Sequence, residues 1–188
     1  MRRVLALAAV LSVALAAPGL AAAPKPQITD PAGDAPAGAG YDIVSALFST
    51  QGNTQKVGRK TVYTPTKLVV TVTYAGTVAA DPYAAQVVEF DLPGCENVYL
   101  ERFSGGTWGA SGCLETFDYG AKASGKTVTF TLPFSVIGKS IMKKGAVLSG
   151  LRTYTAIADP VLGYETAELS AGQVTLDSAT TTKTYKIA

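Results

Sequence analysis

The stretch Leu68-Val69-Val70-Thr71-Val72-Thr73-Tyr74 decides the fold of this chain. Its first, third, fifth and seventh side chains are large and apolar, and two threonines and a valine alternate with them. This period of two predicts a β-strand with one buried face. Residues 126–132 repeat the pattern, with Val128, Phe130 and Leu132 on the apolar side. The two segments predict strands that share one core.

Further short alternating segments lie on both sides of these strands, separated by Gly, Pro and Asp. We expect strands over residues 42–50, 85–92, 97–103, 106–110, 115–121, 146–157 and 182–187. Only residues 133–138 favour a helical turn, and no long segment has a period of 3.6. The pattern predicts an all-β antiparallel sandwich, jelly-roll or immunoglobulin-like, of about nine strands.

The amino terminus has the features of a secretory signal peptide. Two arginines follow Met1, an apolar run extends over residues 4–17, and small residues end at Ala23. The run is shorter than the ~20 apolar residues of a membrane span. We therefore predict a signal peptide over 1–22, an amino-terminal segment with an acidic loop over 23–40 and a sandwich domain over 41–188. The protein is expected to be secreted, with no membrane attachment after cleavage.

Composition excludes several classes of function. The chain has 16 Lys plus Arg and 14 Asp plus Glu. Removing Arg2 and Arg3 leaves 16 − 2 = 14 basic residues against 14 acidic residues, so the secreted chain has no net charge. We expect no nucleic-acid partner, because such partners need a concentrated basic surface. The absence of histidine excludes Ser-His-Asp catalysis and the usual His-ligated zinc and haem sites.

Cys95 and Cys113 are the two cysteines of the chain. An even number of cysteines in an exported protein predicts a disulfide, because that compartment is oxidising. The enclosed sequence resembles a strand, a Gly-Gly turn and a returning strand, so the bridge would close a hairpin. Closing a loop of this length contributes about 3 kcal/mol in the chain-entropy model.

An acidic loop precedes the first expected strand. Asp30, Asp34 and Asp42 lie within thirteen positions, separated by a Gly- and Ala-rich stretch. Calcium takes carboxylate and carbonyl oxygens from such flexible loops. The alternative is turn formation, in which these aspartates cap backbone amides. The spacing differs from the EF-hand pattern, and both interpretations stay open from the residues alone.

Several motifs together resemble the exported β-sandwich domains of the DOMON-like and family 9 carbohydrate-binding-module group. They are Asp-Pro-Ala-Gly-Asp at 30–34, Tyr-Asp-Ile-Val-Ser-Ala at 41–46, the strand at 68–72 and the segment at 128–138. The resemblance implies a structural calcium held by Asp30, Asp34 and Asp42. The haem site of some relatives is not implied, since the chain lacks histidine. The alanine-rich signal and Thr-rich ending also resemble small secreted proteins of high-GC Gram-positive bacteria.

Aromatic residues are the candidates for ligand binding. Trp108 lies next to a Gly-rich turn and Tyr99 is on the facing strand; Tyr119, Tyr154 and Tyr164 are further candidates. Aromatic rings stack on the apolar faces of sugars, which predicts an extracellular or cell-wall glycan as a partner. The alternative is that these rings belong to the core or form cross-strand pairs.

Catalysis has only weak sequence support. Glu89 with Asp91, or Glu115 with Asp118, could act as paired carboxylates, and residues 140–143 read Ser-x-x-Lys. Nothing in the sequence marks a cleft around them. We therefore expect a non-catalytic secreted binding module with a structural calcium. The alternative is a secreted structural or protein-interaction protein without a small-molecule ligand.

Overall fold

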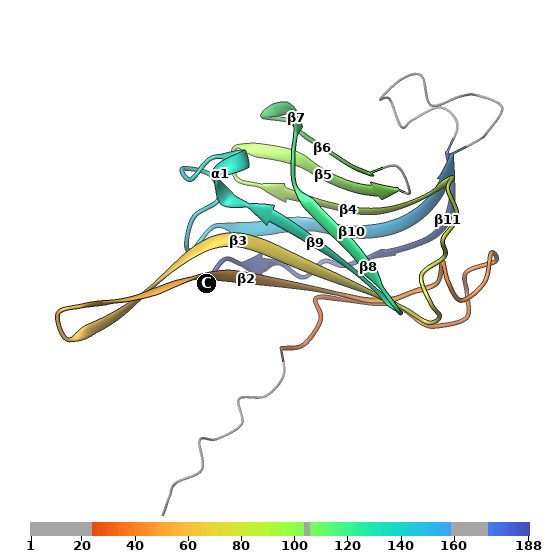
Figure 1. Ribbon diagram of the computed structural model, residues 1–188, viewed down its shortest axis with the longest axis horizontal. Coiled ribbons are helices and arrows are strands. Elements are labelled where there is room, and N and C mark those ends of the chain that lie inside the picture. The colour runs from red at the N-terminus through yellow and green to blue at the C-terminus, as the bar shows by residue number, and fades with distance from the viewer. Residues whose placement is uncertain (1–23, 104–105, 159–172) are drawn as a thin grey trace, which may run out of the picture.

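The computed structural model describes residues 24–103, 106–158 and 173–188 (Figure 1). The expected signal peptide and Tyr164 lie outside these residues. The described chain forms two antiparallel sheets that pack face to face, together with one helical turn. The predicted all-β sandwich with one disulfide is confirmed.

The first sheet has five strands in the order β1-β2-β3-β9-β8. Every neighbouring pair is antiparallel. The strands are β1 (Ile28–Thr29), β2 (Ile43–Val57), β3 (Lys60–Tyr74), β9 (Thr127–Pro133) and β8 (Gly120–Ser124).

The second sheet has the order β11-β10-β4-β5-β6-β7, and the short β12 also pairs with β10. We call it the seven-stranded sheet. Its strands are β11 (Gln173–Thr180), β10 (Val147–Ala158), β4 (Ala84–Leu92), β5 (Cys95–Phe103), β6 (Gly106–Ser111), β7 (Leu114–Phe117) and β12 (Tyr185–Lys186). Helix α1 (Phe134–Ile137) is the predicted helical turn after β9.

The core lies between the sheets and is made by alternate positions of the central strands. In β3 the apolar positions that the sequence marks, Leu68 to Tyr74, are buried, and those of β9 are buried opposite them. Phe48 of β2 meets Phe90 of β4 edge to face, with ring centroids 6.2 Å apart. The period of two therefore identified the core-facing side correctly.

The described residues form twelve strands rather than about nine, and two predicted strands are broken or shortened. Residues 115–121 are not one strand: β7 ends at Phe117 in the seven-stranded sheet, and β8 begins at Gly120 in the other sheet. The chain crosses between sheets here, so Phe117 and Tyr119 both face the core, at a centroid distance of 6.3 Å. Of residues 182–187, only Tyr185–Lys186 forms a strand, against Val147 and Leu148.

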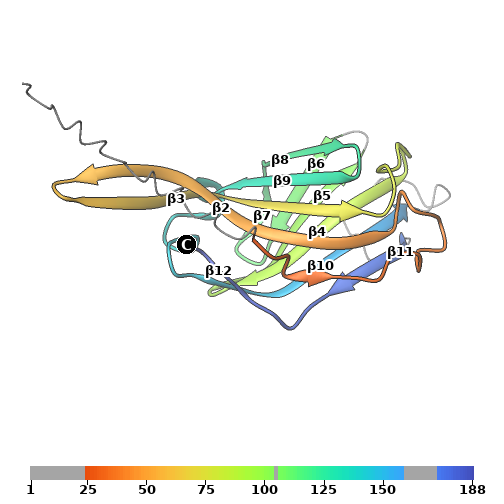
Figure 2. The same cartoon turned by 90° about the horizontal axis from the view of Figure 1, so that it is seen from below.

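The largest unpredicted feature is a projection formed by residues 51–67 of β2 and β3, which we call the arm. It extends well beyond the sandwich in both ribbon views (Figures 1 and 2). The two strands pair as far as Val57 and Lys60, and Gly58 and Arg59 form the turn, with Gly58 at φ +61°. Sequence periodicity ended this hairpin at Thr50 and Leu68 because the arm has no alternating apolar face.

The disulfide joins Cys95, at the start of β5, to Cys113, between β6 and β7, with Cα atoms 5.1 Å apart. The predicted bridge is confirmed. Within the described ranges, no helix has the length and apolar character that crossing a membrane requires.

Candidate functional site

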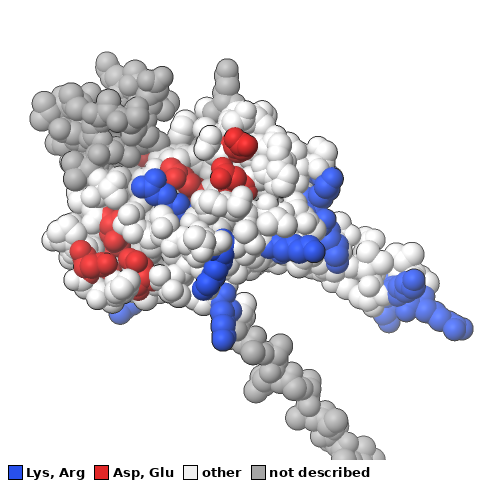
Figure 3. Space-filling model, turned by 180° about the vertical axis from the view of Figure 1, so that it is seen from behind, with Lys and Arg blue, Asp and Glu red and all other residues white. Residues whose placement is uncertain are grey.

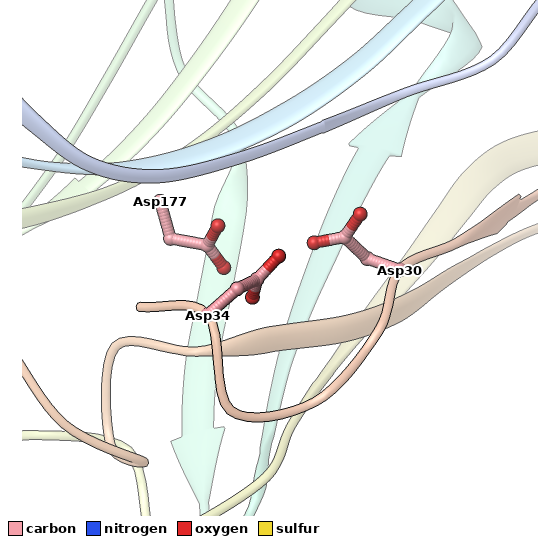
Figure 4. A group of neighbouring side chains, drawn as sticks. All are labelled: Asp30, Asp34 and Asp177. Atoms are coloured by element: carbon pink, nitrogen blue, oxygen red, sulfur yellow. The ribbon is translucent and has the colours of Figure 1, made fainter. Parts of the chain in front are cut away.

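Three aspartates from distant parts of the chain meet at one end of the sandwich. Asp30 follows β1, Asp34 lies in the following loop and Asp177 belongs to β11 (Figure 4). One carboxylate oxygen of each lies within 4.8 Å of those of the other two. Two of these residues were predicted together. Asp177 was not, because it is separated from them by most of the chain.

Asp42, the third predicted ligand, immediately precedes β2 and is not one of the three convergent aspartates. Its side chain is only 2% exposed. One carboxylate oxygen, Oδ2, accepts a hydrogen bond from the Gly33 N–H at 2.6 Å. The other, Oδ1, is buried and has no hydrogen-bond partner among the described residues. We call Asp30, Asp34, Asp42 and Asp177 the aspartate cluster.

Backbone contacts hold the cluster in place. The Ile43 N–H donates to Asp177 Oδ2 at 2.6 Å, which joins β11 to the start of β2. The Asp30 N–H donates to the Val44 carbonyl at 2.9 Å, which fixes the loop against the same strand. Asp30 Oδ2 is a second buried oxygen without a partner in the described part of the chain. An unpaired buried acceptor is costly, so these positions suit a bound cation.

The electrostatics of the cluster are unfavourable without a cation. Burial raises the pKa of Asp30, and the negative charges of Asp177, Asp34 and Asp42 raise it further. Burial also raises the pKa of Asp177, and the negative charges of Asp34 and Asp42 raise it further. Carboxylates crowded on oxygen-rich loops are the ligands of hard cations such as Ca²⁺. The residues present therefore fit a calcium ion.

The second candidate region is the outer face of the seven-stranded sheet, the side turned away from the core. Tyr99 and Trp108 lie there on β5 and β6, with ring centroids 5.4 Å apart in an edge-to-face arrangement. Tyr154 of β10 packs with Tyr99 in a small apolar cluster completed by Ala85, Val87 and Ala156. Trp108 is half-buried. The predicted pair Tyr99 and Trp108 is thus in direct contact.

A pocket of about 170 Å³ opens beside Tyr99 at the turn between β4 and β5. It is lined by Glu89, Phe90, Asp91, Asn97, Tyr99 and Gly150. The Tyr154 hydroxyl donates to Glu89 Oε1 at 2.9 Å, and Arg152 lies 3.6 Å from Glu89 Oε2. The Asn97 N–H donates to Asp91 Oδ1 at 2.9 Å. The pocket combines one aromatic ring with two oriented carboxylates.

Glu101 is a buried acid on the same outer face, opposite Trp108 in the β5–β6 pairing. Its side chain is 8% exposed, and burial raises its pKa to about 7. No sequence signal distinguishes Glu101 from the exposed Glu96 on the same strand.

The other sequence candidates fall in different places. Tyr119 packs against the core and not on the outer face. Its ring stacks on that of Phe130, with ring centroids 6.3 Å apart. Ser140 lies in the turn after α1, away from any strand. Glu89 and Asp91 share the outer face, as the strand spacing predicts, and both carboxylates already accept hydrogen bonds within the protein.

Comparison of the chain with protein-family models, with curated proteins and with solved structures gave no match. The fold and site together define an all-β sandwich with one disulfide and an acidic loop. The resemblance to DOMON-like and family 9 carbohydrate-binding domains stays a prediction.

Proposed function

We propose that this protein is a non-catalytic, exported binding module whose amino-terminal loop is locked onto the sandwich by a structural calcium ion. The observation that carries the calcium proposal is the buried, unpartnered Oδ1 of Asp42 beside three convergent carboxylates. Asp30, Asp34, Asp42 and Asp177 would supply the ligand oxygens. The ion would neutralise their repulsion and tie β1, β2 and β11 together.

Thermal unfolding in EDTA and in excess Ca²⁺ tests the calcium site. At a hundred times Kd, a single bound ion adds about 2.7 kcal/mol. For a domain of this size that raises Tm by about 5 to 10 °C. Asp177→Asn keeps an acceptor for the Ile43 N–H but removes a charge. It should raise Tm in EDTA and abolish most of the response to calcium.

Asp118→Asn is the matched control, because Asp118 is exposed and lies outside the cluster. Its response to calcium should equal that of the wild-type protein. A wild-type melting curve that is identical in EDTA and in excess Ca²⁺ rejects the calcium site.

The bound ligand that the outer face suits best is an extracellular or cell-wall carbohydrate. Support comes from the contact between Trp108 and Tyr99 beside a pocket with oriented carboxylates. Sugars are bound by aromatic faces together with hydrogen-bonding groups of this kind. Affinity for insoluble glycans should fall at least about tenfold in Trp108→Ala. No retention of the wild-type protein on any glycan would reject this ligand.

Export is supported by the Cys95–Cys113 disulfide, which persists in oxidising compartments. The signal-peptide pattern at the amino terminus points the same way. Detection of the protein in the culture medium, shortened to begin near residue 23, would support export, and retention of the full-length chain inside cells would reject it.

A protein-interaction role without a small-molecule ligand is the second candidate function. It is favoured by the arm, which carries exposed valines outside the sandwich. Deleting the arm separates the two candidates: Trp108-dependent retention on glycans should persist without the arm, whereas a protein interaction made through the arm should be lost.

A further inference from the structure

The arm lacks the contacts that normally stabilise paired strands. Strand β3 pairs with β9 only from Lys67 onward, and β1 reaches β2 only at Ser45 and Ala46. Among the described residues, those between Gly52 and Thr66 therefore pair only with each other. The ribbon extends about 20 Å beyond the sheet at the usual rise per residue. Two-stranded ribbons are marginally stable in water without a surface to pack on.

One face of the arm carries two valines and a lysine near the turn. Val57 pairs with Lys60 and Gln55 pairs with Val62, so these four side chains share a face. Val57 is 62% exposed and Val62 is 44% exposed. Two neighbouring exposed valines at the end of a ribbon form an apolar surface that a partner could cover.

All charged side chains of the hairpin that contains the arm are basic. Residues 43–80 contain Lys56, Arg59, Lys60 and Lys67 and no acidic residue. Basic and no acidic side chains are seen at the end of the arm, whereas the body carries both acidic and basic side chains (Figure 3). Since residues 23–188 have no net charge, the countercharge of the arm lies elsewhere on the same chain. A cationic arm on one copy is complementary to an acidic pocket on another copy of the same chain.

The outer-face pocket carries the negative charge that the arm lacks. Asp91 supplies a negative charge, whereas Glu89 is already paired with Arg152 at 3.6 Å, and Tyr99 supplies an apolar wall. The aspartate cluster offers carboxylates without an apolar surface, and it lies at the opposite end of the molecule from the arm. The β4–β5 turn beside the pocket lies at the end from which the arm projects (Figure 1). With a two-fold symmetry axis near this end, the arm of each copy would dock on the pocket of the other copy.

We propose that the protein forms a symmetric dimer in which the arm of each copy docks on the outer-face pocket of the other, with Val57, Val62 and Lys60 at the contact. The contact is reciprocal, so each chain is both donor and acceptor of an arm. This inference goes beyond the proposed function and does not require calcium, but the arm would occupy the pocket proposed above for a sugar, so dimerisation and glycan binding should compete.

Sedimentation equilibrium of the oxidised protein over a wide concentration range tests the dimer. Wild-type protein should reach twice the monomer mass. Val57→Ser with Val62→Ser, and separately Lys60→Glu, should each raise the dissociation constant at least about tenfold. Lys122→Glu is the matched control: Lys122 is an exposed base of the same sheet outside the arm, and its variant should dimerise like wild type.

Asp91→Asn tests the acceptor side and keeps an acceptor for the Asn97 N–H. It should weaken dimerisation, and a circular dichroism spectrum equal to that of wild type excludes misfolding as the reason. Replacing residues 52–65 with Asn-Gly should give a folded monomer whose Trp108-dependent glycan retention is at least that of the wild-type protein, because no partner's arm then occupies the pocket.

Three outcomes would overturn the proposal. The first is a wild-type monomer at every concentration. The second is a dimer that the arm variants leave unchanged. The third is an arm that binds anionic phosphatidylglycerol vesicles while the protein stays monomeric, which would make a membrane surface the partner instead.

Discussion

Strands β2 and β3 differ sharply between their two halves. In the half that lies on the sandwich, Phe48, Leu68 and Val70 are almost completely buried against the second sheet. In the arm, Val57 and Val62 of the same strands face solvent. Hydrogen bonds continue through both halves, so pairing alone does not distinguish them. The comparison shows that burial, not pairing, distinguishes the half that belongs to the core from the half that is exposed to solvent.

The largest expected effect comes from the buried half. Phe48→Ala removes a ring that contacts Phe90 and Tyr185, which should lower the free energy of unfolding by about 3 to 5 kcal/mol. Chemical denaturation with urea measures this loss. A loss below about 1 kcal/mol would show that the sandwich half is no better packed than the arm.

A buried charge gives the sandwich a pH response that the exposed arm should lack. The pKa of Glu101 is raised to about 7 from an ordinary value of 4.5, so the folded protein binds its proton more tightly than the unfolded chain. Stability is therefore greatest below pH 4.5 for this group and declines as pH rises through 7. The decline amounts to up to about 3 kcal/mol.

Glu101→Gln isolates this contribution, because other groups titrate equally in both proteins. The variant should gain stability relative to wild type from pH 5 to pH 8 in urea denaturation. The same difference at both pH values would contradict the burial of an ionisable Glu101.

The smallest effect is expected in the arm. Val57→Ser with Val62→Ser should change the free energy of unfolding of the monomer by less than about 0.5 kcal/mol, since both side chains are exposed. Urea denaturation must be done at low protein concentration so that association does not contribute. A loss comparable to that of Phe48→Ala would mean that the arm is packed within its own molecule.

The sequence predicted the features that depend on local alternation of apolar and polar residues. It could not predict contacts between residues that are far apart in the chain. Residues 68–74 and 126–132 show their buried face directly, and the helical turn at 133–138 follows from its break in alternation. Asp30, Asp34 and Asp42 are close in sequence, so their grouping was visible. Asp177 was not, because its place depends on the pairing of β11 with β10.

The crossing of the chain between the two sheets was also not predictable from the sequence. Residues 117–123 alternate without a clear interruption, yet Asp118 and Tyr119 carry the chain from one sheet to the other. The arm was missed for the opposite reason, since Gln, Thr and Lys in its β2 half and Thr and Lys in its β3 half interrupt any apolar alternation. Because the arm is exposed to solvent, its sequence lacks the alternating apolar positions by which a strand is recognised.

The crossing after Phe117 also affects solubility. Strands β7 and β8 are the edges of their sheets on this side, and they have four and five residues respectively. Exposed edge strands can template the addition of strands from other molecules, which is a route to amyloid. Here two short edges are consecutive parts of one segment, and Lys122 lies on one of them. This side of the sandwich therefore offers little backbone for uncontrolled aggregation.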